Sequence, residues 1–207
     1  MEFTTEQALV LREILRWRRD VRHFRTDPVD EEVLRMLIAV MAAAPSVGNA
    51  RPWRVIRVRD KGLRQNVRRE FERCNSAALE TYSGERAETY AGLKLAGLDA
   101  APEQFVIFTD MEPEAGHRLG RATMAETLRQ STAMAIHTLW LAARAENLGM
   151  GMVSIVDPER MEEIFDVPAD WEFAAYLCIG HPEFSDDTPL LHRAGWQENA
   201  PTLWEDR

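Results

Sequence analysis

The sequence predicts a fold in which helices and strands alternate along one chain and helices cover a sheet, which is the α/β or α+β class. Three observations support this prediction. Helical patterns, with apolar residues three and four positions apart, recur along the chain, and short apolar runs stand between them. No internal repeat or low-complexity tract interrupts the alternation. With 207 residues, 45% of them hydrophobic, the chain can form a core of its own.

The first half of the chain predicts two helices, a strand and a further helical region. Thr4 and Gln7 are a candidate capping box for a helix that runs into an arginine-rich segment. Asp30 is a candidate N-cap for the next helix, which Pro45 ends. Beyond it we expect a strand over 53–58, a turn at 60–62, a polar helix over 63–82 and a second helical stretch after Ser83-Gly84.

The second half of the chain continues the alternation. We expect a buried strand over 105–109, a long helix over 122–147, a strand over 150–156, a helix that starts at Asp157-Pro158 and a strand over 172–180. After Gly180 the chain becomes polar. We therefore expect residues 1–207 to form a single domain, with 181–207 as a C-terminal tail.

The charge balance and the cysteines narrow the class of protein. The net charge is −9, so nucleic acid and anionic membrane are not expected partners. No apolar run is long enough for a transmembrane helix, and the N-terminus lacks the basic start and apolar run of a signal peptide, so we expect a cytoplasmic protein. Cys74 and Cys178 favour two free thiols, with a disulfide left open. No metal site is expected.

A cluster of cations stands out from this acidic chain. Between Arg16 and Arg25 there are five arginines and one acid, Asp20. Guanidinium groups bind phosphate through charge-assisted hydrogen bonds, so the cluster predicts an anion site. The alternative is a solvated helix end, where cations favour the helix dipole, and it is the better explanation of the cluster taken alone.

Two further segments have the composition of ligand-binding loops. Residues 44–53 are rich in small residues, and Gly48 would allow a ligand to approach the backbone closely. Residues 148–155 place glycines beside an apolar strand in which Ser154 is the one polar side chain. Taken alone, the first is equally an ordinary helix-to-strand turn and the second a buried strand.

The order of these segments resembles a known family. Arg18-Arg19-Asp20-Val21-Arg22, Pro28, 44–48 and Pro52-Trp53 are similar to the opening of the nitroreductase-like flavoprotein superfamily. Further motifs resemble its dimethylbenzimidazole synthase branch: Ser83-Gly84-Glu85-Arg86, 93–95, 119–121, Ser131-Thr132, 139–146, 153–155, 176–180 and Gly195-Trp196. The likeness covers roughly residues 12 to 200, nearly the whole chain.

This resemblance implies a more specific fold. Members of the family have an α+β (α/β sandwich) fold in which helices flank a central, mostly antiparallel sheet. They form homodimers with FMN at the subunit interface, so a homodimer that acts on a small molecule is expected here.

The resemblance also implies the site residues. Within the cofactor-binding segment Arg18, Arg19, Asp20, Val21 and Arg22, the three arginines would hold the phosphate and ribityl chain of FMN. Pro45 and Ser46 would line the flavin, and Lys94 would reach its polar edge. Asp20 and Ser154 match the two catalytic residues of the synthase branch. A carboxylate among arginines is expected to stay ionised and to act as a base.

In that branch reduced FMN is the substrate as well as the bound flavin, and dioxygen is the co-substrate that fragments it. NAD(P)H is a candidate reductant, and a separate flavin reductase is a candidate partner. The sequence departs from the branch at Arg51, Gln130, His137, Met152 and Gln197. These departures keep two alternatives open: an NAD(P)H-dependent FMN reductase of the nitroreductase type, and a flavin-binding protein without turnover.

Overall fold

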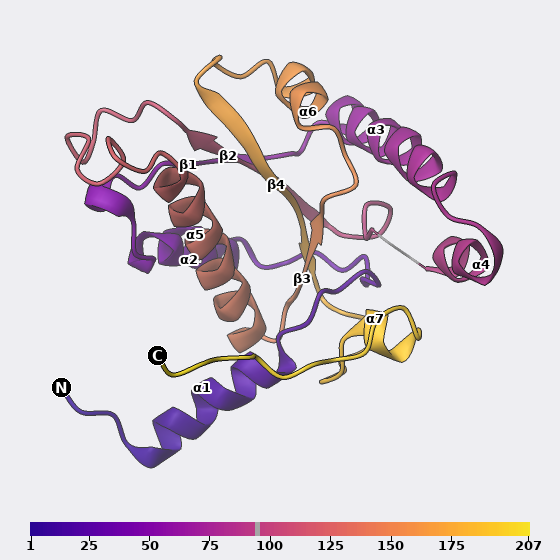
Figure 1. The fold of residues 1–207 in the computed structure, drawn as a ribbon, viewed down its shortest axis with the longest axis horizontal. Coiled ribbons are helices and arrows are strands. Elements are labelled where there is room, and N and C mark those ends of the chain that lie inside the picture. The colour runs from indigo at the N-terminus through magenta and orange to yellow at the C-terminus, as the bar shows by residue number, and fades with distance from the viewer. Residues whose placement is uncertain (94–95) are drawn as a thin grey trace.

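A four-stranded sheet lies at the centre of the computed structural model, which describes residues 1–93 and 96–207 (Figure 1). Its strands are β1 (Trp53–Arg57), β2 (Glu103–Asp110), β3 (Gly149–Val153) and β4 (Trp171–Gly180), in the order β1-β2-β4-β3. All three pairs of neighbouring strands are antiparallel. The expected α+β fold with an antiparallel sheet is therefore confirmed.

Helices surround this sheet. They are α1 (Thr5–Trp17), α2 (Glu31–Val40), α3 (Lys61–Leu79), α4 (Gly84–Gly92), α5 (Glu126–Ala145), α6 (Pro158–Phe165) and α7 (Leu190–Arg193), with short 3-10 turns η1 (Met41–Ala43) and η2 (Val47–Asn49). Among the described residues no helix is long and apolar enough to span a membrane.

The predicted helix starts are confirmed by their caps. Thr4 and Gln7 form the capping box of α1, Asp30 accepts hydrogen bonds at the start of α2, and Asp157 does so at the start of α6. Most boundaries differ from the prediction by a few residues; for example, α2 ends at Val40 and not at Pro45, and α3 ends at Leu79 and not at residue 82. The helix α5 begins at Glu126 instead of residue 122, after a run of turns, and β3 ends at Val153, so that Ser154 follows the strand.

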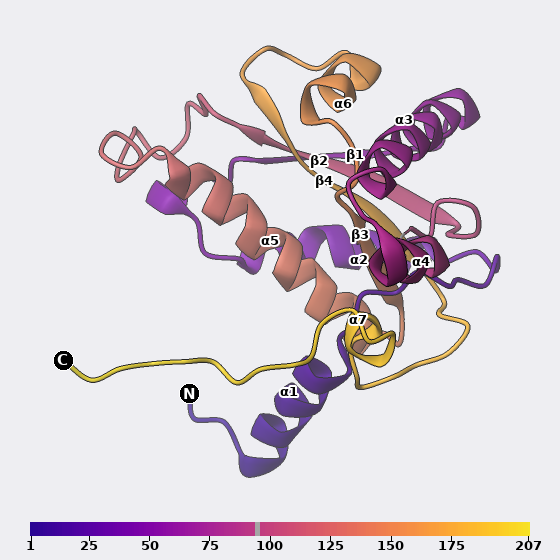
Figure 2. The ribbon, with the colours of Figure 1, turned by 45° about the vertical axis from the view of Figure 1, so that its right-hand side comes forward.

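The two faces of the sheet pack against different helices, and each face has its own core. Figures 1 and 2 show α2 and α5 on one face and α3 and α6 on the other. The strand β2 is buried along its whole length because its side chains alternate between the two cores. Phe105 and Ile107 pack with α2 and α5, whereas Val106 and Phe108 pack on the opposite face.

A buried carboxylate ties α3 to α6 on that second face. Glu70 is 6% exposed; it accepts hydrogen bonds from the Asp157 amide at 3.1 Å and from the Cys74 thiol at 3.1 Å. Arg73 forms an ion pair with it at 2.7 Å. The hydrogen bond from Arg73 is the main reason that the pKa of Glu70 falls to about 2. Cys74 and Cys178 are both free thiols, and Cys178 is fully buried.

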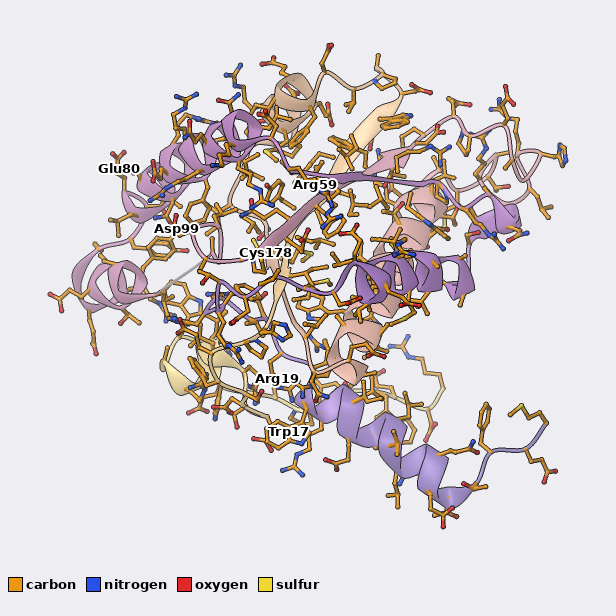
Figure 3. The ribbon with its side chains drawn as sticks, turned by 180° about the vertical axis from the view of Figure 1, so that it is seen from behind. Trp17, Arg19, Arg59, Glu80, Asp99 and Cys178 are labelled. Carbon is orange, nitrogen blue, oxygen red and sulfur yellow. The ribbon has the colours of Figure 1, made fainter. Side chains whose placement is uncertain are left out.

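The helix α1 projects from the body and contributes no buried residue. Leu9, Val10 and Leu11 are each at least half exposed, and the last residues of the chain project on the same side (Figures 1 and 2). Figure 3 shows Trp17 and Arg19 where α1 joins the body, and Cys178 within the sheet. A capped helix with an exposed apolar face is typical of an interaction surface.

Candidate active site

The arginine-rich segment leaves α1 and runs alongside the edge strand β3. Asp20 forms an isolated parallel bridge with Met150, and the Val21 amide donates to the Met150 carbonyl at 3.1 Å. This close approach depends on glycine, because a Cβ at Gly151 would lie 2.1 Å from the Val21 carbonyl oxygen. At Gly149 a Cβ would come within 2.8 Å of the Val21 side chain. The glycines of β3 therefore determine where the cluster lies.

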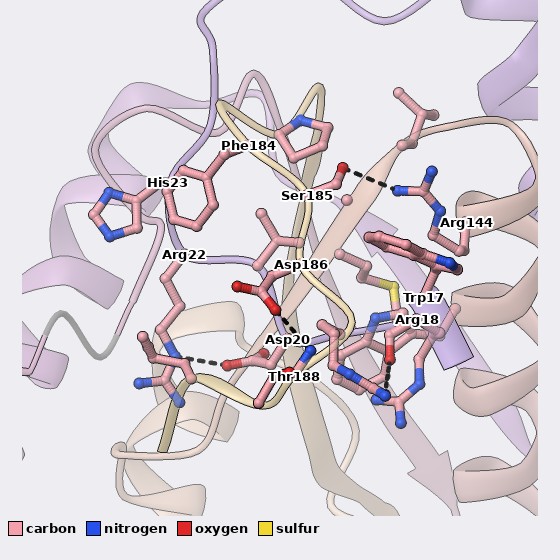
Figure 4. A pocket seen from close by; sticks show the side chains of 18 of the residues that line it. Trp17, Arg18, Asp20, Arg22, His23, Arg144, Phe184, Ser185, Asp186 and Thr188 are labelled. Atoms are coloured by element: carbon pink, nitrogen blue, oxygen red, sulfur yellow. Dashed lines mark hydrogen bonds and ion pairs between the residues drawn. The ribbon is translucent and has the colours of Figure 1, made fainter. Parts of the chain in front are cut away.

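Both oxygens of the Asp20 carboxylate are held. Oδ1 accepts a hydrogen bond from the Met152 amide at 3.0 Å, and Oδ2 accepts one from Arg22 Nε at 2.6 Å (Figure 4). The side chain of Asp20 is 29% exposed and that of Arg22 13%. A carboxylate that is fixed by two donors and still open to solvent is suited to accept a proton at a defined position.

A crevice opens beside Asp20, and arginines from three parts of the chain line it. Arg18, Arg19 and Arg22 come from the predicted cluster, Arg144 from α5 and Arg193 from α7. The volume of the crevice is about 40 Å³. Arg144 and Arg193 are not predicted from the sequence to be site residues, because nothing near either residue marks it as part of this cluster.

The segment after β4 closes one side of the crevice (Figure 4). Arg193 pairs with Asp186 at 3.1 Å, and Arg19 Nε donates to the Asp187 carbonyl at 2.8 Å. Arg16 pairs with the Asp187 carboxylate at 2.5 Å, and this hydrogen bond lowers the pKa of Asp187. Part of the region expected to be a tail thus contributes the wall of the site, together with one carboxylate, Asp186, that pairs with an arginine of the crevice.

Arg18 is in a different environment from the other arginines of the crevice. Its guanidinium carbon lies 5.0 Å from the centre of the Trp140 ring. Burial lowers the pKa of Arg18, and the nearby charge of Arg19 lowers it further. Neither Arg18 Nε nor Trp140 Nε1 is exposed or has a hydrogen-bond partner in the part of the chain that the structure describes.

A larger hollow lies beside Trp140. Its volume is about 390 Å³. It is lined by Thr109, Arg129, Ala133, Ile136, His137, Trp140, Met152, Glu172, Phe173 and Ala174. Trp140 lines both this hollow and the crevice. Since the Met152 amide also holds Asp20, the hollow and the crevice meet at the end of β3.

Pro45 and Ser46 lie at the opposite end of α5 from the crevice. The amide of Val47, which follows them, donates to Ser131 Oγ at 3.0 Å, near the start of the helix. Trp140 is about 13 Å further along α5, at about 1.5 Å per residue. One chain therefore does not bring Pro45 and Ser46 to the arginines.

The other residues singled out from the sequence are Ser154, Lys94 and the five departures from the family pattern. Ser154 is exposed and lies two residues beyond Met152, at the same end of β3 as Asp20. Lys94 lies outside the described residues. The five departures named above are all exposed, and two of them, His137 and Met152, line the hollow.

The site fits an anionic group such as a phosphate. Its donor set consists of guanidinium groups, which match phosphate geometry, and one of them, Arg18, has an unpartnered buried N–H. Sites that enclose a small molecule usually have about 300–1,000 Å³, so the crevice of one chain has room only for the anionic end. No group of three His, Cys, Asp or Glu side chains among the described residues is placed to hold a metal ion.

Comparison with known sequences places these features in context. The profile of the nitroreductase family matches residues 15–181. A 5,6-dimethylbenzimidazole synthase of Rhodobacter capsulatus is 63% identical over 207 residues, which is 100% of both chains. The 5,6-dimethylbenzimidazole synthase of Rhodospirillum rubrum is 53% identical over 188 residues, which cover 91% of this chain and 89% of that protein.

The fold is also found among solved structures. Oxidized iodotyrosine deiodinase bound to FMN and 3-iodo-L-tyrosine superposes with a TM-score of 0.73 at 22% identity. The match covers 95% of this chain and 97% of that structure. At this identity the likeness concerns the fold alone.

Proposed function

The chain belongs to the nitroreductase family, and from this premise we propose that it is a flavin enzyme of the dimethylbenzimidazole synthase type, which uses dioxygen to fragment reduced FMN. The observation that carries the proposal is the 63% identity to such a synthase over the full length of both chains. The arginine crevice supports it, because a phosphorylated substrate requires such a set of donors.

In this proposal the arginines bind the phosphate and ribityl chain. Arg18 and Arg19 bind the phosphate, and Arg22 has the double task of contacting the ligand and fixing Asp20 through Oδ2. The backbone of Val21 stays on β3, so the whole segment is rigidly placed. Lys94 would reach the polar edge of the ring.

Reduced FMN, when bound, would supply the electrons for the reduction of dioxygen, and its atoms would leave as dimethylbenzimidazole, a tetrose phosphate and a third fragment that carries the rest of the pyrimidine ring. Asp20 accepts a proton from a ribityl hydroxyl or from the ring, because its oxygens are already oriented by Met152 and Arg22. The Ser154 hydroxyl forms no hydrogen bond within the described chain, so it is available to donate one to the ligand. NAD(P)H, through a separate flavin reductase, is the proposed source of reduced FMN.

We also propose that the active form is a homodimer whose site is shared. Two observations support this: Pro45 and Ser46 lie far from the arginines of their own chain, and α1 exposes an apolar face. An obligate dimer would bury more than about 2,000 Å². The free thiols, Cys74 and Cys178, are consistent with the cytoplasmic location that we propose.

A complementation experiment tests the shared site. One variant carries Arg19→Met and the other Ser46→Trp, and each alone should be inactive. When the two chains are unfolded together and refolded, mixed dimers contain one intact site, and about a quarter of the wild-type activity should return. Sedimentation as a monomer with bound FMN, or no recovery on mixing, would contradict the shared site.

The reaction itself is tested with reduced FMN in air, and the products are identified by mass. Asp20→Asn and Ser154→Gly should bind FMN and form little or no dimethylbenzimidazole. Wild-type rates in these variants would remove their catalytic assignment. Intact reoxidised FMN, with steady consumption of NAD(P)H in the presence of a nitroaromatic, would instead favour a reductase. FMN binding without either turnover would indicate a protein that has lost the chemistry.

A further inference from the structure

Trp140 lies at the junction of the crevice and the hollow, and neither the sequence analysis nor the family resemblance assigned it a task. It is on the second half of α5, and its indole ring faces the guanidinium of Arg18 with 5.0 Å between ring centre and guanidinium carbon. Stacking of this kind is attractive and becomes stronger where water is excluded. The ring therefore fixes the position of Arg18.

The neighbouring arginines show what is unusual about this pair. Arg22 pairs with Asp20, Arg193 with Asp186, and Arg19 donates to two backbone carbonyls. The Arg18 guanidinium has no hydrogen bond or ion pair with any described residue, and its contact is the face of Trp140. The charge of Asp20 favours the Arg18 cation, but the Asp20 carboxylate pairs directly with Arg22. Arg18 is therefore a partly desolvated cation beside another cation, without an ion pair of its own, and such a site is prepared for an anion.

The unpartnered donors point in the same direction. A buried N–H group without an acceptor is unfavourable, and such groups are rare in folded proteins unless a ligand or water satisfies them. Here two of them, Arg18 Nε and Trp140 Nε1, occur on stacked side chains. Trp140 also lines the hollow, so its side chain borders both the crevice that contains Arg18 and the space of about 390 Å³.

We propose that Trp140 is a positioning residue for the phosphate of the ligand: it holds the Arg18 guanidinium in a poorly hydrated, fixed orientation, so that binding the phosphate completes the contacts of Arg18. This inference rests on the proposed binding of FMN. It assigns the selectivity for a phosphorylated over a non-phosphorylated flavin to the pair of Arg18 and Trp140, and not to the arginines alone.

The test compares the affinities of the full-length protein for FMN and for riboflavin, which lacks the phosphate, by quenching of flavin fluorescence. Trp140→Leu removes the ring face, and FMN affinity should fall about 5- to 30-fold, whereas riboflavin affinity should change less than about twofold. Trp140→Phe keeps a ring face without the N–H and should stay within about threefold of wild type for FMN. It also keeps the inference testable if the leucine variant does not fold.

Two further measurements distinguish a role of Trp140 in positioning Arg18 from a general contribution of Trp140 to the stability of the fold. Combining Trp140→Leu with Arg18→Met should weaken FMN binding no more than Arg18→Met alone, because the indole acts through the guanidinium. The matched control is Trp171→Leu, which removes a similar partner of Arg54, at 5.8 Å, away from the crevice. It should leave the ratio of FMN to riboflavin affinity unchanged.

The outcomes that overturn the inference are distinct from failure of the proposed function. Equal losses for FMN and riboflavin, or additive effects of Trp140→Leu and Arg18→Met, would mean that the indole only shapes the site. If wild type binds neither flavin, the proposed function fails, and inorganic phosphate then serves as the probe. A rise in Tm with phosphate that Trp140→Leu abolishes would uphold the inference, whereas no such rise in wild type would overturn it.

Discussion

Replacing Gly151 with alanine tests how β3 places the candidate catalytic carboxylate. The added Cβ would lie 2.1 Å from the Val21 carbonyl oxygen, whereas ordinary contact begins at 3.4 Å, so the segment that carries Asp20 must move by about 1.3 Å. Two hydrogen bonds join this segment to β3: Val21 N–H to the Met150 carbonyl at 3.1 Å, and Met152 N–H to Asp20 Oδ1 at 3.0 Å. Because both hydrogen bonds are already 3.0–3.1 Å long, a movement of about 1.3 Å would break them.

The magnitude follows from these contacts. Overpacking costs about 1–3 kcal/mol and each of the two lost hydrogen bonds about 0.5–1.5 kcal/mol, so the free energy of unfolding should fall by about 2–6 kcal/mol. For a chain of this length the Tm should fall by about 4–24 °C. Turnover should fall further than FMN affinity, because Arg144 and Arg193 lie on α5 and α7, outside the displaced segment.

Thermal unfolding, FMN titration and product formation should be measured on the same preparation. Gly92→Ala is the matched control, since nothing lies within 4 Å of the added Cβ at the end of α4, and it should unfold at or above the wild-type Tm. A Gly151→Ala protein with wild-type Tm and wild-type turnover would refute the argument that this glycine sets the position of Asp20.

Three further outcomes are expected. Asp186→Asn should tighten FMN binding by about 1.5- to 5-fold, because Arg193 then no longer has to break its ion pair with a carboxylate before it binds the ligand. The control Asp27→Asn, outside the crevice, should leave FMN binding unchanged. Weaker FMN binding by Asp186→Asn would contradict this reasoning. The pKa of Glu70 is about 2 in the folded protein, below its ordinary 4.5, so its stabilisation is complete above pH 4.5 and is lost as the pH falls toward 2. The free energy of unfolding of Glu70→Gln, measured with urea, should therefore fall less than that of wild type between pH 4.5 and pH 2. An equal fall in the two proteins would show that Glu70 is not the group responsible. Burial raises the pKa of Cys178 to about 12, so at pH 8 a thiol reagent should modify it only at the rate of unfolding; rapid modification of the native protein would show that this core opens.

Local chemistry made much of the fold predictable. Helix starts could be predicted because capping depends on a few adjacent residues, as at Thr4, Asp30 and Asp157. Residues 105–108 in the middle of β2 form a continuous apolar run because both faces of the strand are covered. The start of α5 was predicted too early because residues 122–124 have a helical composition, while the turns before them keep these residues out of the helix.

The candidate site was predictable only in part. The arginine cluster and Asp20 are adjacent in the sequence, so composition alone marks them. Arg144 and Arg193 join them only through tertiary packing, and no local pattern signals this. The stacking of Trp140 on Arg18 connects α5 to the end of α1 across more than a hundred residues and could not be read from either segment.

The separation of Ser46 from the arginines has a similar origin. The family resemblance placed both groups around one flavin, yet within a chain they lie toward opposite ends of α5. A sequence does not state whether two parts of a site belong to the same molecule. Because α5 is long, Ser46 and the arginines of one chain are too far apart to contact the same flavin. For this reason we propose a site that is shared by two chains.

The central claim is that this protein consumes reduced FMN as a substrate. The most direct measurement is a mass balance: a known amount of reduced FMN is exposed to air with the protein, and flavin and dimethylbenzimidazole are quantified together by mass spectrometry. We predict that each FMN lost appears as one dimethylbenzimidazole, and that Asp20→Asn stops both changes. Quantitative recovery of intact oxidised FMN in the presence of the wild-type protein would contradict the claim.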